Sequence, residues 1–345
     1  MVEAQSLVRG RDGARIARLG AVIIGCFILN LLVACAPARQ SALIPSEAPI
    51  PHFETEQDRF VTFDGAALGL TVWEATSGEP EIVVVGVHGM NDYANAFHMA
   101  APWWAERGVT TYAYDQRSFG RSPDRGIWPD EELLREDLRT AVRIAREQHP
   151  DAILALVGIS MGGAVAMTTY GSDNPPEGVD RLVLTGPGLR GWGALPLAYR
   201  VSLWSSAHMR PAWVVTPPAN IVRIEPSDNI EMLRRSWNDP LMLRDNRIDH
   251  VLGAVTVMEN AHKSAHRLPV NTFLTYGAKD IVIPPRGMKR TAKRLPAHVR
   301  TAYYADGYHM LLRDLQAETV WADILSFMQE PDADIPSGAP ELPWR

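Results

Sequence analysis

The chain has 345 residues, 46% of them hydrophobic and 21% charged, so it can bury a large core and has the composition of an ordinary globular protein. Its net charge of −6, without a block of basic residues, argues against a nucleic-acid-binding protein. Both cysteines, Cys26 and Cys35, lie near the N-terminus, so the rest of the chain has no disulfide and no cysteine-ligated metal site.

A secretory signal peptide is predicted over residues 1–34. Basic residues over 9–18 precede an apolar stretch over 19–34, which is the usual pattern of such a signal. The stretch ends in Leu32-Val33-Ala34-Cys35, which resembles a bacterial lipobox, so we expect cleavage after residue 34 and lipidation of Cys35. An uncleaved membrane anchor is the main alternative, although about 16 apolar residues are short for a membrane span; a buried helix is a third interpretation.

This signal predicts a lipoprotein of the bacterial cell envelope. The mature chain would carry 30 basic and 38 acidic side chains, a charge of −8. Anionic lipids would repel it, so the N-terminal lipid anchor must hold it at the membrane. By the sorting rule of other bacteria, Ala36 after Cys35 favours the periplasmic face of the outer membrane over the inner one.

Beyond the signal, the sequence predicts an α/β fold. The lipidated Cys35 and the Pro/Ala-rich residues that follow are expected to form a tether over 35–55. The alternation of strands and helices over 56–330 predicts a mostly parallel central sheet flanked by helices. The predicted strands span 60–63, 68–74, 81–87, 109–115, 152–157, 181–185, 270–276 and 299–304. The predicted helices span 95–107, 129–148, a segment after Ser160, 285–294 and 310 to about 328. Residues 331–345 are expected to form a loose acidic Pro-rich tail.

One segment, about 187–261, interrupts the alternation and is interpreted as an inserted cap. It contains Trp192, Trp204, Trp213 and Trp237. A cap would lie over the carboxyl ends of the strands, where such sheets bind ligands. Its aromatic and Met residues indicate an apolar acyl pocket. The plainer interpretation is that most of these tryptophans fill the core of the cap.

A predicted nucleophile follows the strand at 152–157. Gly158-Ile159-Ser160-Met161-Gly162 matches the G-x-S-x-G nucleophile elbow, in which a strand turns sharply into a helix. Side chains at 158 and 162 would collide with neighbouring backbone. The free N–H groups at the helix start would face the developing negative charge. We therefore predict Ser160 as the nucleophile; the alternative is an ordinary Gly-rich turn.

A serine nucleophile needs a base and an orienting carboxylate, which α/β-hydrolases supply in the order Ser, acid, His. Asp280 follows the strand over 270–276, and His309 follows the strand over 299–304, so both are expected on loops beside Ser160. Asp306 is a weaker candidate for the acid because it lies too close to His309 in sequence. The other histidines considered and set aside are His88, His250, His262, His266 and His298.

With these residues identified, the chain resembles the monoacylglycerol lipase and lysophospholipase branch of the α/β-hydrolases, also classed as serine aminopeptidase-like. The resemblance covers about residues 60–328. It is carried by His88-Gly89-Met90, Tyr114-Asp115-Gln116-Arg117-Ser118-Phe119-Gly120-Arg121-Ser122, Gly158–Gly163, Asn238-Asp239-Pro240-Leu241, Gly277-Ala278-Lys279-Asp280 and Tyr308-His309-Met310-Leu311-Leu312. In the second motif, Ser118 and Phe119 replace the usual Gly-His pair, which bears on substrate shape more than on activity.

The resemblance implies hydrolysis of a carboxylic ester through an acyl-enzyme, with no metal and no organic cofactor. It also implies an oxyanion hole made by the backbone N–H groups of Met90 and Met161. We predict a membrane-anchored serine ester hydrolase acting on a small lipid-like monoacyl ester, such as a monoacylglycerol or a lysophospholipid.

Three alternatives remain at the level of sequence. A serine aminopeptidase-like peptidase would hold a free amine with cap acids such as Glu225, Asp228 and Glu231. Acyl transfer to an alcohol would use the same triad in a drier site. A non-catalytic binding lipoprotein would use the fold alone. The sequence determines neither the oligomeric state nor the acyl length and headgroup of the substrate.

Overall fold

The computed structural model describes residues 37–215 and 225–345. The predicted signal peptide over 1–34 and the predicted lipidation site Cys35 lie outside the described residues. Within the described ranges, no helix is both long and apolar enough to cross a membrane.

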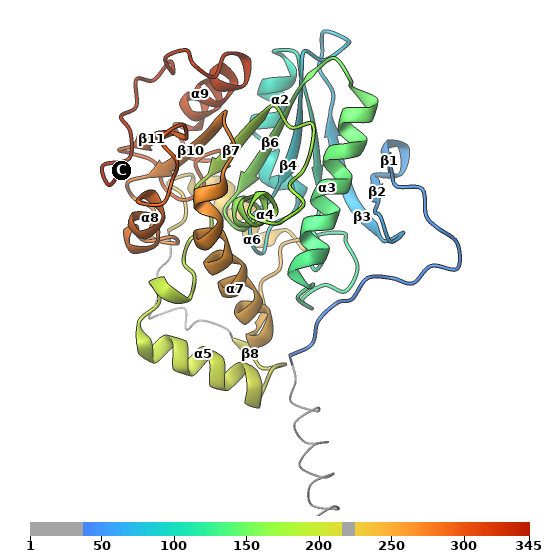
Figure 1. The fold of residues 1–345 in the computed structure, drawn as a ribbon, viewed down its shortest axis with the longest axis vertical. Helices are drawn as coiled ribbons and strands as arrows, with labels where there is room; N and C mark the ends of the chain where they lie inside the picture. The colour runs from blue at the N-terminus through green and yellow to red at the C-terminus, as the bar shows by residue number, and fades with distance from the viewer. Residues whose placement is uncertain (1–36, 216–224) are drawn as a thin grey trace, which may run out of the picture.

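Nine strands of the described chain form a central sheet in the order β1-β2-β3-β5-β4-β6-β7-β10-β11 (Figure 1). The strands are antiparallel from β1 to β5 and parallel from β5 to β11. Val87 at the end of β4 pairs with both Tyr114 and Gly158, so the carboxyl ends of β4, β5 and β6 meet at one edge. The strands are β1 (His52–Glu54), β2 (Arg59–Val61), β3 (Ala67–Trp73), β4 (Ile82–Val87), β5 (Val109–Tyr114), β6 (Ile153–Ile159), β7 (Arg181–Thr185), β10 (Thr272–Gly277) and β11 (Arg300–Tyr304).

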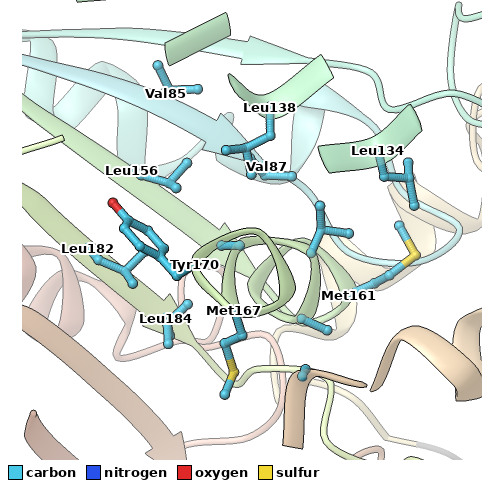
Figure 2. Close-up of a cluster of buried hydrophobic side chains, with 14 of the residues drawn as sticks. Val85, Val87, Leu134, Leu138, Leu156, Met161, Met167, Tyr170, Leu182 and Leu184 are labelled. Atoms are coloured by element: carbon cyan, nitrogen blue, oxygen red, sulfur yellow. The ribbon is translucent and has the colours of Figure 1, made fainter. Parts of the chain in front are cut away.

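Helices cover both faces of this sheet, as the alternation predicted. The helices are α2 (Ala100–Ala105), α3 (Glu131–Gln148), α4 (Met161–Tyr170), α7 (Ile248–Ser264), α8 (Pro285–Ala292) and α9 (Ala317–Gln329). On β4, Val85 and Val87 join the buried cluster that contains α3, α4, α7 and α8, whereas Val84 joins the cluster under α2 and α9. Figure 2 shows the first cluster, with strand side chains facing α3 and α4. The sheet is therefore buried on both faces, which explains why β4 is almost continuously Val and Ile.

The cap begins after β7 and has a small core of its own. It contains the 3₁₀-helix η3 (Trp192–Ala194), α5 (Leu197–Met209), α6 (Ile230–Asn238) and a two-stranded ribbon of β8 (Val214–Val215) and β9 (Asn246–Arg247). Its buried core comprises Leu195, Leu203, Ala207, Ile248, Leu252 and Val255. The structure differs from the predicted boundary at 261, because Ala254, Val257, Met258 and Ala261 of α7 pack in the main core. The cap therefore ends within α7, one helix that belongs to both parts.

The expected cap tryptophans lie mostly outside any core. Trp204, Trp213 and Trp237 are 58%, 51% and 69% exposed. Trp192 is partly buried and packs against the cap core.

The N-terminal segment expected as a tether is attached to the folded body. Gln40 is buried, its backbone N–H donates to Trp128 O at 3.0 Å, and its side chain donates to Ile127 O at 2.7 Å. Ahead of it, the N–H of Ala38 donates to the buried carboxylate of Asp249 on α7. The sequence thus predicted an extended tether over 35–55. In the structure, residues 38 and 40 are instead hydrogen-bonded to the folded body, and residues 52–54 form β1.

The C-terminal segment, expected as a loose tail over 331–345, is packed against the sheet. Leu342 is buried, and the Trp344 ring lies 5.9 Å from that of Tyr276 and 5.7 Å from that of Tyr303. The Arg345 guanidinium donates to backbone carbonyls over 296–299. Buried apolar side chains among the prolines anchor a segment that composition alone describes as loose.

The last helix begins at Ala317, not at Met310 as expected. Residues 310–316 form turns instead, because Arg313 and Asp314 are buried in polar contacts. Arg313 pairs with Asp92, and Asp314 accepts the N–H of Tyr308 at 2.8 Å. These contacts hold the chain on the loop that carries His309.

Candidate active site

Ser160, His309 and Asp280 form a continuous hydrogen-bonded chain, although long stretches of sequence separate them. His309 Nε2 lies 2.9 Å from Ser160 Oγ, and His309 Nδ1 lies 2.8 Å from Asp280 Oδ2. All three side chains are buried, with less than a tenth of each residue exposed. The residues follow β6, β11 and β10, whose carboxyl ends lie at the same edge of the sheet. The arrangement has the geometry of nucleophile, base and orienting acid.

The turn that presents Ser160 is strained, as the elbow motif predicts. Ser160 has φ 50° and ψ −115°, and α4 begins at the next residue. A Cβ at Gly158 would lie 2.7 Å from Gly163 Cα, and one at Gly162 would lie 2.6 Å from His88 O. These distances confirm that the glycines at both positions avoid backbone collisions. The motif therefore reflects close packing of backbone around the serine.

Asp280 is held in place by backbone donors. Its Oδ1 accepts the N–H groups of Val282 at 2.9 Å and Ile283 at 2.8 Å, which leaves Oδ2 for His309. The rival acid Asp306 instead pairs with Lys279 Nζ at 2.8 Å on the surface. The structure thus brings Asp280, and not Asp306, to the histidine.

The segment His88-Gly89-Met90 lies against the serine. His88 is fully buried; its Nε2 accepts the N–H of Gln116 at 2.8 Å and its Nδ1 lies 2.7 Å from Gly89 O. Burial lowers the pKa of His88, and this pair of contacts fits a neutral ring that donates from Nδ1. A Cβ at Gly89 would lie 3.1 Å from Ser160 Cβ, so the backbone leading to Met90 passes directly beside Ser160.

Met161 is the first residue of α4, so its N–H has no carbonyl partner within the helix. The predicted oxyanion donors, Met90 and Met161, therefore belong to two backbone segments that meet at Ser160.

The motif over residues 114–122 builds a buried polar framework next to the His88 segment, whereas the sequence related this motif only to the shape of the substrate. The Asp115 carboxylate accepts the N–H groups of Ala94 and Arg121 at 2.9 and 2.8 Å. The buried Arg117 guanidinium pairs with Asp64 and Asp137, each at 2.7 Å. Asp64 and Asp137 were missed because nothing near them in sequence indicates a buried charge.

The departure from the usual Gly-His pair has a local explanation. Ser118 has φ 84°, a conformation that glycine adopts without strain. Phe119 is fully buried, with its ring 5.4 Å from that of His88 and 5.2 Å from that of His250. Phe119 thus fills the space between the His88 segment and α7 with an apolar ring.

An apolar pocket of about 390 Å³ opens beside the triad, between the body and the cap. Val282 and Ile283, whose N–H groups hold Asp280, lie on one side, and Met90 lies on another. The remaining lining residues are Arg190, Leu195, Tyr199, Ser202, Leu203, Ile248, Val251, Ala254, Val255 and Met258. The cap supplies most of the apolar lining, as expected, but through Leu195 and residues of α5 and α7, and none of the four tryptophans contributes to it.

The cap acids considered for an amine site already have partners. Asp228 Oδ1 accepts the N–H of Leu315 at 2.8 Å, and Glu231 pairs with Arg235 at 3.1 Å. Glu225 has a partner as well. Within the described ranges, no cluster of three or more His, Cys, Asp or Glu side chains is arranged to hold a metal ion.

Comparison of the sequence with known proteins finds a matching family and relatives that are named as lipases. Residues 78–316 match the family described as serine aminopeptidase, S33. The chain is 26% identical over 273 residues to a protein named monoacylglycerol lipase from Mycolicibacterium smegmatis, covering 78% of this chain and 95% of that protein. It is 22% identical over 294 residues to the rat protein named monoglyceride lipase, covering 83% and 91% of the two chains.

Two solved structures share the fold. The monoacylglycerol lipase of Paleococcus ferrophilus superposes with a TM-score of 0.62 at 22% identity, covering 76% of this chain and 98% of that one. A soluble variant of Saccharomyces cerevisiae monoglyceride lipase, in complex with a substrate analog, superposes with a TM-score of 0.64 at 16% identity, covering 86% and 99%.

Proposed function

We propose that this chain, which belongs to the serine aminopeptidase S33 family and has the α/β-hydrolase fold, hydrolyses monoacyl lipid esters through a Ser160-His309-Asp280 triad. The observation that carries the proposal is the buried hydrogen-bonded chain of these residues beside an apolar pocket of about 390 Å³. The relatives named monoacylglycerol lipase and monoglyceride lipase support an ester of glycerol or a related headgroup as substrate.

The proposed mechanism follows from the geometry. His309 takes the proton of Ser160 as Oγ attacks the ester carbonyl, and Asp280 keeps Nδ1 protonated and stabilises the imidazolium. The backbone N–H groups of Met90 and Met161 stabilise the oxyanion of the tetrahedral intermediate. His309 then gives its proton to the leaving alcohol, which leaves an acyl group on Ser160. In the second half of the reaction, His309 takes a proton from water as the water attacks the acyl carbonyl. His309 then returns this proton to Ser160 Oγ as the carboxylic acid leaves.

The pocket and the cap surface support a lipid as the acyl donor. Eleven of the pocket residues are apolar or aromatic, so an alkyl chain in the pocket would be removed from water. The adjoining helix α5 exposes large apolar side chains at Leu197, Tyr199, Val201, Trp204 and Met209. With the predicted lipid anchor at Cys35, these features support an enzyme that works at a membrane surface.

The peptidase alternative receives less support from the site. An aminopeptidase needs free carboxylates for the substrate amine, whereas Asp228 and Glu231 are engaged in the hydrogen bond and ion pair described above. None of the described residues that line the pocket beside the triad carries a carboxylate.

The test uses soluble protein that begins at Ala36. Hydrolysis of a monoacylglycerol, a lysophospholipid, a series of p-nitrophenyl esters and an aminoacyl anilide is compared with that of Ser160→Ala as the blank. We expect ester turnover that rises with acyl length up to the capacity of the pocket. Turnover of the anilide with little ester hydrolysis would replace the lipase proposal with the peptidase one. Failure of a fluorophosphonate probe to label Ser160 would revive the non-catalytic alternative.

A further inference from the structure

Among the described residues that line the apolar pocket, Arg190 carries the one charged side chain. Apart from Arg190 and Ser202, every lining residue is apolar or aromatic. A guanidinium does not contribute to binding an alkyl chain, and an arginine placed there is suited to planar recognition of carboxylate or phosphate. Its position therefore bears on which part of the substrate is charged.

The backbone of Arg190 is fixed from two sides. Two residues earlier, the N–H of Gly188 donates to Ser160 O at 2.7 Å, which ties this segment to the nucleophile. The preceding residue Leu189 is buried. Its carbonyl oxygen lies so close to Gly287 of α8 that a Cβ added to Gly287 would collide with this oxygen. Arg190 is thus presented from a rigid part of the site.

The Arg190 side chain is exposed and makes no hydrogen bond or ion pair with any described residue. In the part of the chain that the structure describes, no carboxylate or carbonyl accepts a hydrogen bond from its guanidinium. Neighbouring arginines differ in this respect. Arg200 of α5 donates to Leu195 O at 2.9 Å, and Arg290 of α8 pairs with Glu259 at 3.0 Å. Arg190 therefore keeps its full donor capacity for a ligand.

The surface next to Arg190 is also positively charged, in a protein that is acidic overall. The helix α8, which packs against Leu189, borders a hollow of about 640 Å³. Its lining residues are His262, Arg286, Lys289, Arg290, Lys293 and Arg294, and they include no carboxylate. Burial and the nearby cations of this hollow lower the pKa of His262. An anion at the pocket rim would therefore meet a favourable field.

We propose that Arg190 binds an anionic group of the substrate, so that the enzyme prefers a negatively charged monoacyl ester over a neutral monoacylglycerol. This inference rests on the proposed function and narrows its substrate class. Two kinds of monoacyl ester carry such an anionic group. One has a phosphate on the alcohol part, as in a lysophospholipid, and the other has a carboxylate at the far end of the acyl chain. In both, guanidinium N–H groups donate to anionic oxygens while the alkyl part occupies the apolar pocket.

The test compares three esters of equal acyl length at concentrations below micelle formation. They are 1-decanoylglycerol, 1-decanoyl lysophosphatidate and the glycerol monoester of decanedioic acid. The measured quantity is the ratio of kcat/KM for each anionic ester to that for the neutral ester. We expect a ratio above one in the unmodified protein, lowered about tenfold or more in Arg190→Gln. Arg190→Lys keeps the charge but loses the fork of donors, so it should give an intermediate ratio.

A matched control is Arg234→Gln on α6, which removes the same charge from an exposed cap position outside the pocket. It should leave the ratio unchanged. Added salt should lower the ratio of the unmodified protein more than that of Arg190→Gln, which keeps only the field of the neighbouring hollow.

The outcomes distinguish a headgroup phosphate from an acyl-end carboxylate, and they distinguish failure of anion binding by Arg190 from failure of the proposed ester hydrolysis. A high ratio for lysophosphatidate alone assigns the anion to the headgroup, and one for the dicarboxylate ester alone assigns it to the acyl end. An equal ratio in the unmodified protein and in Arg190→Gln overturns the inference while leaving ester hydrolysis intact. Absence of turnover of every ester, short p-nitrophenyl esters included, overturns the proposed function and the inference with it.

Discussion

A Cβ atom added to Gly162 would lie 2.6 Å from the carbonyl oxygen of His88, and it would be closer still to that of Val87. The first turn of α4 therefore rests directly on the end of β4. Because the segment from His88 to Met90 continues from that strand end, the nucleophile and the predicted oxyanion donor Met90 are positioned by one backbone contact.

Gly162→Ala should consequently impair both folding and catalysis. The added methyl meets backbone carbonyls, which do not move aside as the end of a flexible side chain does, so α4 and β4 must separate. We expect a loss of about 1–3 kcal/mol in the free energy of unfolding, measured by urea denaturation. In the folded fraction, kcat for a p-nitrophenyl ester should fall. Unchanged stability would show that the contact is looser than the structure indicates.

Replacing each candidate residue in turn should show that turnover depends on Ser160 and Asp280 and not on Asp306. Ser160→Ala should lower kcat/KM by at least about 10³ with little change in Tm, because the hydroxyl acts only in the reaction. Asp280→Asn should lower kcat by about 10³ to 10⁴, because the amide NH₂ group would face His309 Nδ1 and favour the wrong tautomer of the ring. The amide oxygen would stay with the N–H groups of Val282 and Ile283. Asp306→Asn is the control, because Asp306 pairs with Lys279 on the surface. Greater loss in Asp306→Asn than in Asp280→Asn would refute the assignment.

Asp314 predicts a pH dependence of stability. Burial raises the pKa of this carboxyl from 3.8 to about 6, and this effect outweighs the opposing hydrogen bonds from Ser227 and from the N–H of Tyr308. Between pH 4 and 6 the folded state therefore binds more protons at Asp314 than the unfolded state, so the contribution of Asp314 to stability falls as pH rises.

Asp314→Asn removes this titration while keeping a carbonyl for the N–H of Tyr308. The difference in Tm between Asp314→Asn and the unmodified protein should rise in favour of the variant from pH 4 to pH 7. Calorimetry at one-unit intervals measures it, and a constant difference would contradict a raised pKa.

The packed C-terminus predicts that a short truncation is destabilising. Ending the chain at Ala339 removes the buried Leu342 and the Trp344 ring, which packs edge-on against Tyr276 and Tyr303. Burying one large apolar side chain contributes about 1.5–3 kcal/mol, so Tm should fall by several degrees. Trp344→Phe retains an aromatic ring and should show a smaller fall. An unaltered Tm in the truncated chain would support the loose tail that composition predicts.

The N-terminal contacts lead to a similar prediction for Gln40. Its side chain donates to the carbonyls of Ile127 at 2.7 Å and Asp124 at 3.2 Å, and Gln40→Ala leaves both without this donor. We expect a loss of about 1–3 kcal/mol in the free energy of unfolding. Gln316→Ala, which removes a side-chain bond to Asp306 O at an exposed site, is the control. Equal effects in both variants would mean that the segment is not held by these bonds.

Local patterns predicted the elements closest to the chemistry. The Val/Ile run of β4 indicates a strand that is buried on both faces. The glycines around Ser160 indicate close contact between backbone segments. The ends of the domain were predicted less well. Proline and acidic residues conceal Leu342 and Trp344, and the start of α9 depends on the partners of Arg313 and Asp314 elsewhere in the chain.

The sequence by itself therefore determined the α/β fold and predicted the order of nucleophile, acid and base, because strand and helix periodicity and chain order are local properties. Only the tertiary structure decided which acid reaches His309, which cap residues line the pocket and that Arg190 is the charge among them. These depend on the register of β10 and β11 and on the packing of α7 across two cores. Such contacts join residues far apart in the chain, and no local pattern of residues specifies them.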